Sequence, residues 1–411
     1  MNERSTGYAW RNFIFVFLCG VAFSISLMVV PACMLMLVEH FQCDMSTAGW
    51  FMSWSSVAGT VIAFFTASIQ SKVGPKAMVM LAMACVIVSD VICIFAPDAT
   101  VFSVGRFILG FGNGLIATGA PTLICVLFKD PAKRGLPNSV WSVWIAVGQI
   151  IILNLFALLA AAFGGWQAGF WFALIFAVAA LVLGFFLISV PMDEQMAVVR
   201  GTANVKLSAA FTSPYVIICL VMVICFAFCF SCYSAMAPTY YQQAGGMGMA
   251  EANSLNSVST IVGVVGALAV GAVFAKVKNQ PLVLLAVFVL TFIVCCFEFV
   301  PTDPTLIIVE LVAFGFVINA VMPAVFTNVE WASPDPSVIG AAFGVLAIGS
   351  NAGGIPAAPL VGAILESTQG NWALATVPEA VIGAIGLICA IVFFVKRGPV
   401  CKAVLEERSS K

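Results

Sequence analysis

Four charged side chains lie inside the long apolar segments of this chain: Asp90, Arg106, Glu310 and Glu379. A charge near the centre of a bilayer costs about 3 kcal/mol on insertion scales, so charged residues at membrane depth mark ion pairs, substrate paths or proton relays. These four residues are therefore the first candidates for chemistry.

Arg106 is the one cation at membrane depth, and Asp90 lies at a similar depth on the preceding apolar segment. The two residues are equally far along the chain from the turn at Asp98. One interpretation is a structural ion pair. The other is that Arg106 faces a cavity, where it binds an anionic substrate or biases a proton site at Asp90.

Glu310 has no cation close to it in the sequence, and Glu298 lies at comparable depth on the preceding segment. Two neighbouring acids in a low-dielectric environment do not both ionise readily. We therefore predict that Glu310 takes up and releases a coupling proton. The alternative is a hydrated carboxylate in an outer vestibule. Glu379 follows Pro378 near a segment end and is interpreted as hydrated.

Polar side chains in otherwise apolar runs are candidates for the lining of a substrate site. Amides in a membrane also join helices by hydrogen bonds worth about 1 kcal/mol, so packing remains an alternative for each of them. The tryptophans have a third interpretation, as anchors at the membrane interface. With Arg106, the predicted substrate-binding residues are Trp54, Asn113, Trp141, Gln149, Asn256, Asn319 and Asn351.

The composition indicates an integral membrane protein. Of 411 residues, 62% are hydrophobic and 9% charged, against a charged share of about 25% in soluble proteins. The mean hydropathy is +1.12. His40 and the 14 scattered cysteines form no ligand pattern along the sequence, and Cys229 with Cys232 is interpreted as helix packing. We therefore predict no metal, no cofactor and no enzymatic activity.

Twelve apolar segments have the length of about 20 residues that a helix needs to cross a bilayer. A polar stretch over 191–212 separates two six-helix bundles, predicted over 1–190 and 213–411. The expected segments are 12–38, 48–70, 77–96, 100–128, 137–163, 168–190, 213–236, 250–275, 280–300, 304–329, 338–364 and 372–396.

Basic residues predict the orientation of these segments. Of the 17 Lys and Arg, 16 fall on one side of the twelve-segment arrangement, and Arg106 is the exception. Because basic flanks are retained in the cytoplasm, we expect both termini to be cytoplasmic and the protein to lie in the cell (inner) membrane. The absence of a basic face excludes nucleic acid as a partner.

The two halves share a weak repeat at offsets between 202 and 205 residues. A repeat of this length, shared by two halves, suggests that a ligand binds where the halves meet. The matched positions are Gly110 with Gly315, Pro121 with Pro323, Gly135 with Gly340, and Gly148 with Gly353.

Several short motifs resemble those of the major facilitator superfamily. The turn over 67–76 is similar to that family's GxxxDRxGRR signature, with Ser71 in place of the usual Asp. The runs over 106–112, 130–135 and 165–171 also resemble family positions. The resemblance implies a twelve-helix fold and a gating motif formed by Ser71, Lys72, Gly74 and Lys76. The missing acid leaves open whether a hydrogen bond replaces its contact.

These features together predict a secondary transporter that works by alternating access on a small organic solute. Arg106 favours an anion, and Glu310 favours coupling to a proton. The run over 148–154 lacks the GxxxGP pattern of drug/proton antiporters, so uptake is preferred and efflux by proton antiport is the alternative. Monomer is the default state that the resemblance implies. A membrane enzyme would need a polar cluster, for which Glu298 with Glu310 is the one candidate.

Overall fold

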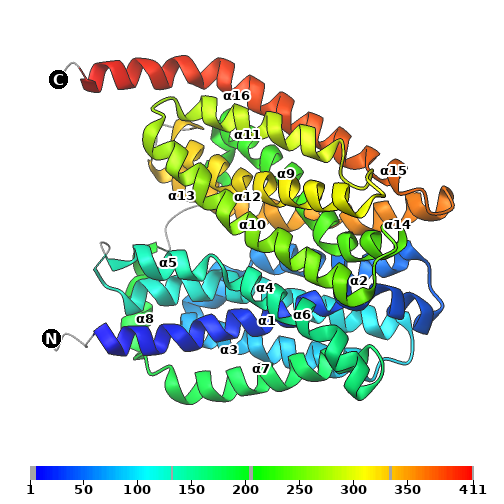
Figure 1. The fold of residues 1–411 in the computed structure, drawn as a ribbon. Coiled ribbons are helices and arrows are strands. Elements are labelled where there is room, and N and C mark those ends of the chain that lie inside the picture. Colours follow the sequence, from blue (N-terminus) through cyan, green and yellow to red (C-terminus); the bar gives the residue numbers. More distant parts are fainter. Residues whose placement is uncertain (1–5, 131–132, 203–206, 333–335, 410–411) are drawn as a thin grey trace. The chain divides into compact units, whose positions relative to one another are not determined.

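The computed structural model describes residues 6–130, 133–202, 207–332 and 336–409, and in these ranges every regular element is a helix (Figure 1). The all-helical prediction is therefore confirmed. Ten of the described helical segments are long and apolar enough to cross a membrane. The helices α2 and α11, with 19 and 16 residues, complete the twelve expected segments.

The first half of the chain folds into one compact unit. It contains α1 and most of α2 through to α8. The helices are α1 (Thr6–Phe41), α2 (Met45–Ala63), α3 (Thr66–Ile94), α4 (Ala99–Leu127), α5 (Gly135–Trp141), α6 (Trp144–Phe163), α7 (Gln167–Leu187) and α8 (Met192–Thr202).

The second half folds into another compact unit, which we describe separately. Its elements are η2 (Leu207–Thr212), α9 (Pro214–Gln243), α10 (Met249–Lys276), α11 (Gln280–Cys295), α12 (Pro304–Ala332), α13 (Pro336–Gly354), α14 (Ala357–Ser367), α15 (Trp372–Ala375) and α16 (Val377–Ser409). The single segments expected over 137–163, 338–364 and 372–396 are thus each divided into two helices.

The turn expected between the second and third segments, over 71–76, is present. Gly74 interrupts the range of α3 with φ +80°, a conformation that glycine adopts without a side-chain clash, and Pro75 follows it directly. Two helices therefore meet at Gly74 within the range given for α3. An additional break lies inside the second expected segment, because α2 ends at Ala63 and α3 begins at Thr66.

Two helical parts lie outside the expected segments. The polar stretch over 191–212 contains α8 and η2, and α16 continues to Ser409 instead of ending near 396. Both extensions have polar sequences, which a search for apolar runs excludes. Apolar length therefore predicts the part of a helix that crosses the membrane and not where that helix ends.

The repeat predicted from matched glycines has the same packing in each half. Gly110 on α4 lies against the backbone oxygen of Ser55 on α2, and Gly315 on α12 lies against that of Ser259 on α10. A Cβ atom added at either glycine would meet that oxygen inside van der Waals contact. Small residues of this kind let membrane helices pack at close range.

Substitution of these glycines should destabilise each unit. We expect Gly110→Leu and Gly315→Leu to lower the free energy of unfolding by about 3 kcal/mol, because the added side chain must displace a backbone. Thermal unfolding of the purified variants in detergent would measure this loss of stability. Gly271→Leu is the control, since α10 leaves open space around Gly271. Equal losses in all three variants would contradict the close-packing interpretation.

Candidate functional site

Arg106 is fully buried and joins three helices through its guanidinium group. It donates hydrogen bonds to the backbone oxygens of Ser26 and Leu27 on α1, and of Phe51 on α2, each at 3.0 Å. The Met52 sulfur lies 3.9 Å from the same group. Backbone oxygens thus occupy most of the donors that an anionic substrate would need, which differs from the expectation of a side chain open to a cavity.

Asp90 and Arg106 are neighbours, but they form no direct ion pair. Ser26 connects them, because its hydroxyl donates to Asp90 Oδ1 at 2.5 Å and its backbone oxygen accepts from Arg106. The other oxygen of Asp90 has no hydrogen-bond partner within the described ranges. The predicted proximity of the two charges is therefore present, with Ser26 between them.

The two tryptophans of α5 and α6 form part of a packed wall. Trp141 and Trp144 stack with ring centroids 5.3 Å apart and are both buried. Gly20 on α1 gives them room, since a Cβ there would lie 3.0 Å from the Trp141 ring. Trp54 is half-buried on α2 between Trp50 and Phe107. Trp141 thus has a packing role in this structure, whereas Trp54 keeps accessible surface.

The amide side chains predicted to line a substrate site differ in their hydrogen bonds and burial. Asn319 donates to Gly315 at 3.0 Å and Asn351 donates to Ala347 at 3.2 Å, both within their own helices. Asn256 is 1% exposed, and its amide nitrogen has no partner among the described residues. Gln149 is also buried, and Asn113 is half-buried. An unpartnered buried donor such as that of Asn256 needs an explanation, and a bound ligand would provide one.

Three buried carboxyl groups come together in the C-terminal unit: Glu298, Glu310 and Glu379. Glu298 and Glu379 have no exposed surface and interact directly with each other. Glu310 interacts electrostatically with both of them. None of the six oxygens accepts a hydrogen bond from a standard donor in the described chain. We call these residues the acidic cluster. Glu379 had been interpreted as hydrated, and that interpretation was wrong.

The acidic cluster has no basic partner. Within the described residues, none of its carboxyl groups lies in a salt bridge with Lys, Arg or His. Two facing carboxyl groups form a hydrogen bond only when one of them holds a proton. The Glu298–Glu379 pair therefore has the arrangement in which two acids share a proton, and Glu310 lies within electrostatic range of it.

Tyrosine hydroxyl groups extend the acidic cluster along α9. Tyr233 and Tyr241 share a hydrogen bond of 2.5 Å, and the hydroxyl of Tyr240 donates to the backbone oxygen of Pro301. Tyr233 also stacks on Phe314 at 4.2 Å. Glu310 interacts electrostatically with all three hydroxyl groups. Hydroxyl groups can both donate and accept, so this arrangement can carry a proton.

A hollow of about 350 Å³ lies in the C-terminal unit. Phe299, which follows Glu298 in the chain, forms part of its wall, and Trp372 forms another part. The Trp372 indole donates to Gln243 at 3.2 Å, which holds the ends of α9 and α15 together. The residues that line this hollow do not include the three acids.

The predicted gating turn contacts α8 in the central segment. Gln195 accepts a hydrogen bond from the backbone N–H of Lys76 at 3.0 Å and donates to Val190 at 2.8 Å. Ser71 donates to the oxygen of Ser68 at 2.8 Å, within its own helix, and does not replace the family's acid in a contact with another element. Lys72 is exposed.

Removal of the Gln195 side chain should destabilise the turn around Gly74 and Lys76. Gln195→Ala leaves the Lys76 N–H without its acceptor, so we expect a loss of about 1 to 3 kcal/mol in local stability. Amide hydrogen exchange around Lys76 would report it. Glu194→Ala is the control, because the Glu194–Lys129 ion pair is exposed to water and contributes little. Unchanged exchange in Gln195→Ala would show that α8 does not hold the turn.

Comparison with known proteins agrees with this architecture. A match of 28% identity over 101 residues relates the chain to "Monosaccharide-sensing protein 3" of Arabidopsis thaliana, covering 24% of this chain and 14% of that protein. The family model "Major Facilitator Superfamily" matches residues 13–355. Its members are multi-pass membrane transporters with twelve helices that move small solutes. The chain therefore belongs to the major facilitator superfamily.

Proposed function

We propose that this protein couples the uptake of a small organic anion to a proton, with Glu310 as the residue that binds the coupling proton. This proposal rests mainly on the position of Glu310. Its side chain is 8% exposed, and its two oxygens have no hydrogen-bond partner among the described residues. It lies near a series of tyrosine hydroxyl groups. A carboxyl group in such a place marks a proton relay more often than a structural contact. Asp90, with one unpartnered oxygen, is the second candidate.

An anionic solute is favoured by the charge of Arg106. No carboxylate binds its guanidinium directly in the described chain, so the positive charge is not cancelled by a salt bridge. The proposed substrate lining includes Trp54, Asn113, Trp141, Gln149, Asn256, Asn319 and Asn351. The printed name of the Arabidopsis relative suggests a neutral monosaccharide instead, and such sugars belong in the same screen.

The preference for uptake rests on the run over 148–154, which lacks the antiporter pattern. The side on which the basic residues gather supports placement in the cell (inner) membrane, as a monomer with both termini in the cytoplasm. Drug or metabolite efflux by proton antiport is the alternative. Reconstituted vesicles with an imposed pH gradient distinguish the two, because uptake by symport follows the proton and efflux by antiport opposes it.

Glu310→Gln should separate proton coupling from solute binding. We expect the variant to lose accumulation driven by a pH gradient and to keep exchange of labelled for unlabelled solute, because a neutral amide cannot carry a proton. Uptake measured in vesicles at equal and unequal pH tests this. Glu251→Gln, an exposed acid on α10, is the control. A variant with unchanged pH dependence would exclude Glu310 as the proton carrier.

Arg106→Gln should test both the structural and the electrostatic role of that residue. The change leaves three buried oxygens without their donor, so we expect a loss of at least about 3 kcal/mol in unfolding free energy. An anion at a hundred times its Kd should add about 2.7 kcal/mol to the wild type and nothing to the variant. A thermal-shift screen of anions, cations and monosaccharides measures both.

The control for this experiment is Arg134→Gln. Arg134 also donates to backbone oxygens, at Phe128 and Lys129, but it lies directly before α5, outside the apolar core. The Arg134→Gln protein should be less stable than the wild type but should still be stabilised by anions. Equal stabilisation by anions in Arg106→Gln would assign Arg106 a purely structural role and remove the argument for an anionic solute.

A further inference from the structure

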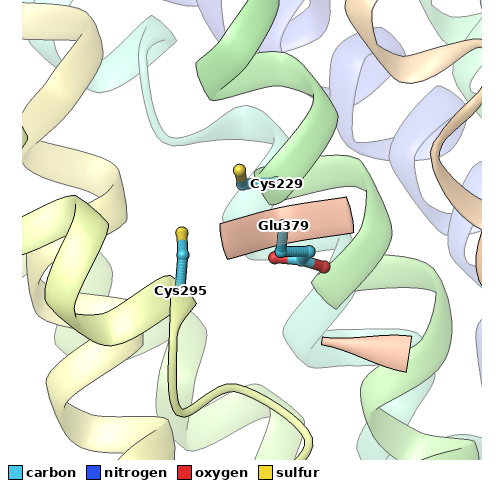
Figure 2. A group of neighbouring side chains, drawn as sticks. All are labelled: Cys229, Cys295 and Glu379. Carbon is cyan, nitrogen blue, oxygen red and sulfur yellow. The ribbon is translucent and has the colours of Figure 1, made fainter. Parts of the chain in front are cut away.

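Two thiols and a carboxyl group meet inside the C-terminal unit, each from a different helix. They are Cys229 on α9, Cys295 at the end of α11 and Glu379 in the first turn of α16 (Figure 2). Their ligating atoms all lie within 4.8 Å of one another, and all three residues are buried. We propose that they form a binding site for a divalent cation that prefers sulfur, with Zn²⁺ as the fitting ion.

The donor set matches the coordination chemistry of zinc. Zn²⁺ binds Cys thiolates and carboxylate oxygens, and most often takes four ligands in a tetrahedron. Cys229, Cys295 and Glu379 supply three of them. Glu298 interacts directly with Glu379, and its protonated carboxyl group can hold that carboxylate in place by a hydrogen bond. Cys232 also lies in contact with Glu379. A ring of sulfur and carboxylate ligands does not suit Mg²⁺ or Ca²⁺, which prefer oxygen alone.

A second observation points to a ligand at this place. Both oxygens of Glu379 and both of Glu298 are buried without an accepted hydrogen bond in the described part of the chain. Neither side chain has exposed surface. Groups that can ionise are rarely left in this state unless they are paired or coordinate a metal. A cation bound by Glu379, with the protonated Glu298 donating a hydrogen bond to that carboxylate, would satisfy the Glu379 oxygens.

The geometry is close to that of a closed site. A tetrahedron with Zn–S bonds of about 2.3 Å places its sulfur atoms about 3.8 Å apart. The present limit of 4.8 Å therefore requires the donor atoms to approach by about 1 Å at most. Cys295 is the last residue of α11 and Glu379 lies in the first turn of α16, so rotation about side-chain bonds at two helix ends can supply the approach.

Charge balance sets the proton stoichiometry of binding. Each thiol must lose its proton to become a ligand, whereas a proton shared by Glu298 and Glu379 can stay on Glu298. One Zn²⁺ then replaces two protons, and two thiolates with one carboxylate surround the ion. This site does not require Glu310, so it is independent of the proposed proton coupling.

Zinc binding to the purified full-length protein in detergent tests the proposal. We expect one tightly held Zn²⁺ per chain by elemental analysis after removal of free metal, with about two protons released per ion. Cys229→Ala, Cys295→Ala and Glu379→Gln should each lower the affinity at least tenfold. Cys219→Ala, a buried thiol on the same helix, is the matched control and should bind as the wild type does.

A second measurement keeps the test decisive if a variant fails to fold. Cd²⁺ bound to the wild-type protein should show a thiolate-to-metal absorption band with the intensity of two thiolates. A wild type that retains no Zn²⁺, or that binds Cd²⁺ without this band, would overturn the proposal. Unchanged zinc affinity in a folded Cys229→Ala and Cys295→Ala pair would also overturn it. Glu310→Gln should bind zinc normally even if it loses proton coupling.

Discussion

The cost of placing charge and unpaired polar groups in hydrocarbon decides most of what is distinctive in this protein. The two halves of the chain stabilise their buried charged groups in different ways. In the first half, backbone oxygens from two other helices solvate the guanidinium group of Arg106, so this residue joins helices while it keeps its positive charge. In the second half, Glu298, Glu310 and Glu379 have no such partners among the described residues. A buried site left in that state depends on a proton or a cation.

The same repeat underlies both halves although their chemistry differs. Gly148 on α6 lies against α1 at Ser24, and Gly353 on α13 lies against α9 at Ile224. The offset between these two glycines equals that between Gly110 and Gly315, so the duplicated feature is the close approach of helices and not the polar residues. Backbone contacts therefore fix the scaffold twice, and each half places its own charges on it.

Much of the fold could be predicted from the sequence, because apolar length and charge asymmetry are local properties. The turn at Gly74 was predicted from its motif, but the helix over 192–202 could not be placed in this way, since it lies outside the apolar runs and contacts that turn through Gln195. The candidate functional site was harder to predict from the sequence than the fold. Asp90 and Arg106 were expected to be neighbours from their distance to one turn, but Ser26 as their bridge lies on a helix far away in the sequence. Glu379 and the cysteines at 229 and 295 come together only in three dimensions.

The buried carboxylate of Glu379 can be satisfied in two ways, by a shared proton or by a bound cation. A proton shared by Glu298 and Glu379 removes one charge without moving any helix. A divalent cation held by Cys229, Cys295 and Glu379 instead joins α9, α11 and α16 at one point. Alternating access needs helices that can change their packing, so an ion that joins three of them restrains the unit, whereas a proton does not. Occupancy by metal would therefore act on transport even though Glu310 lies outside the ligand set.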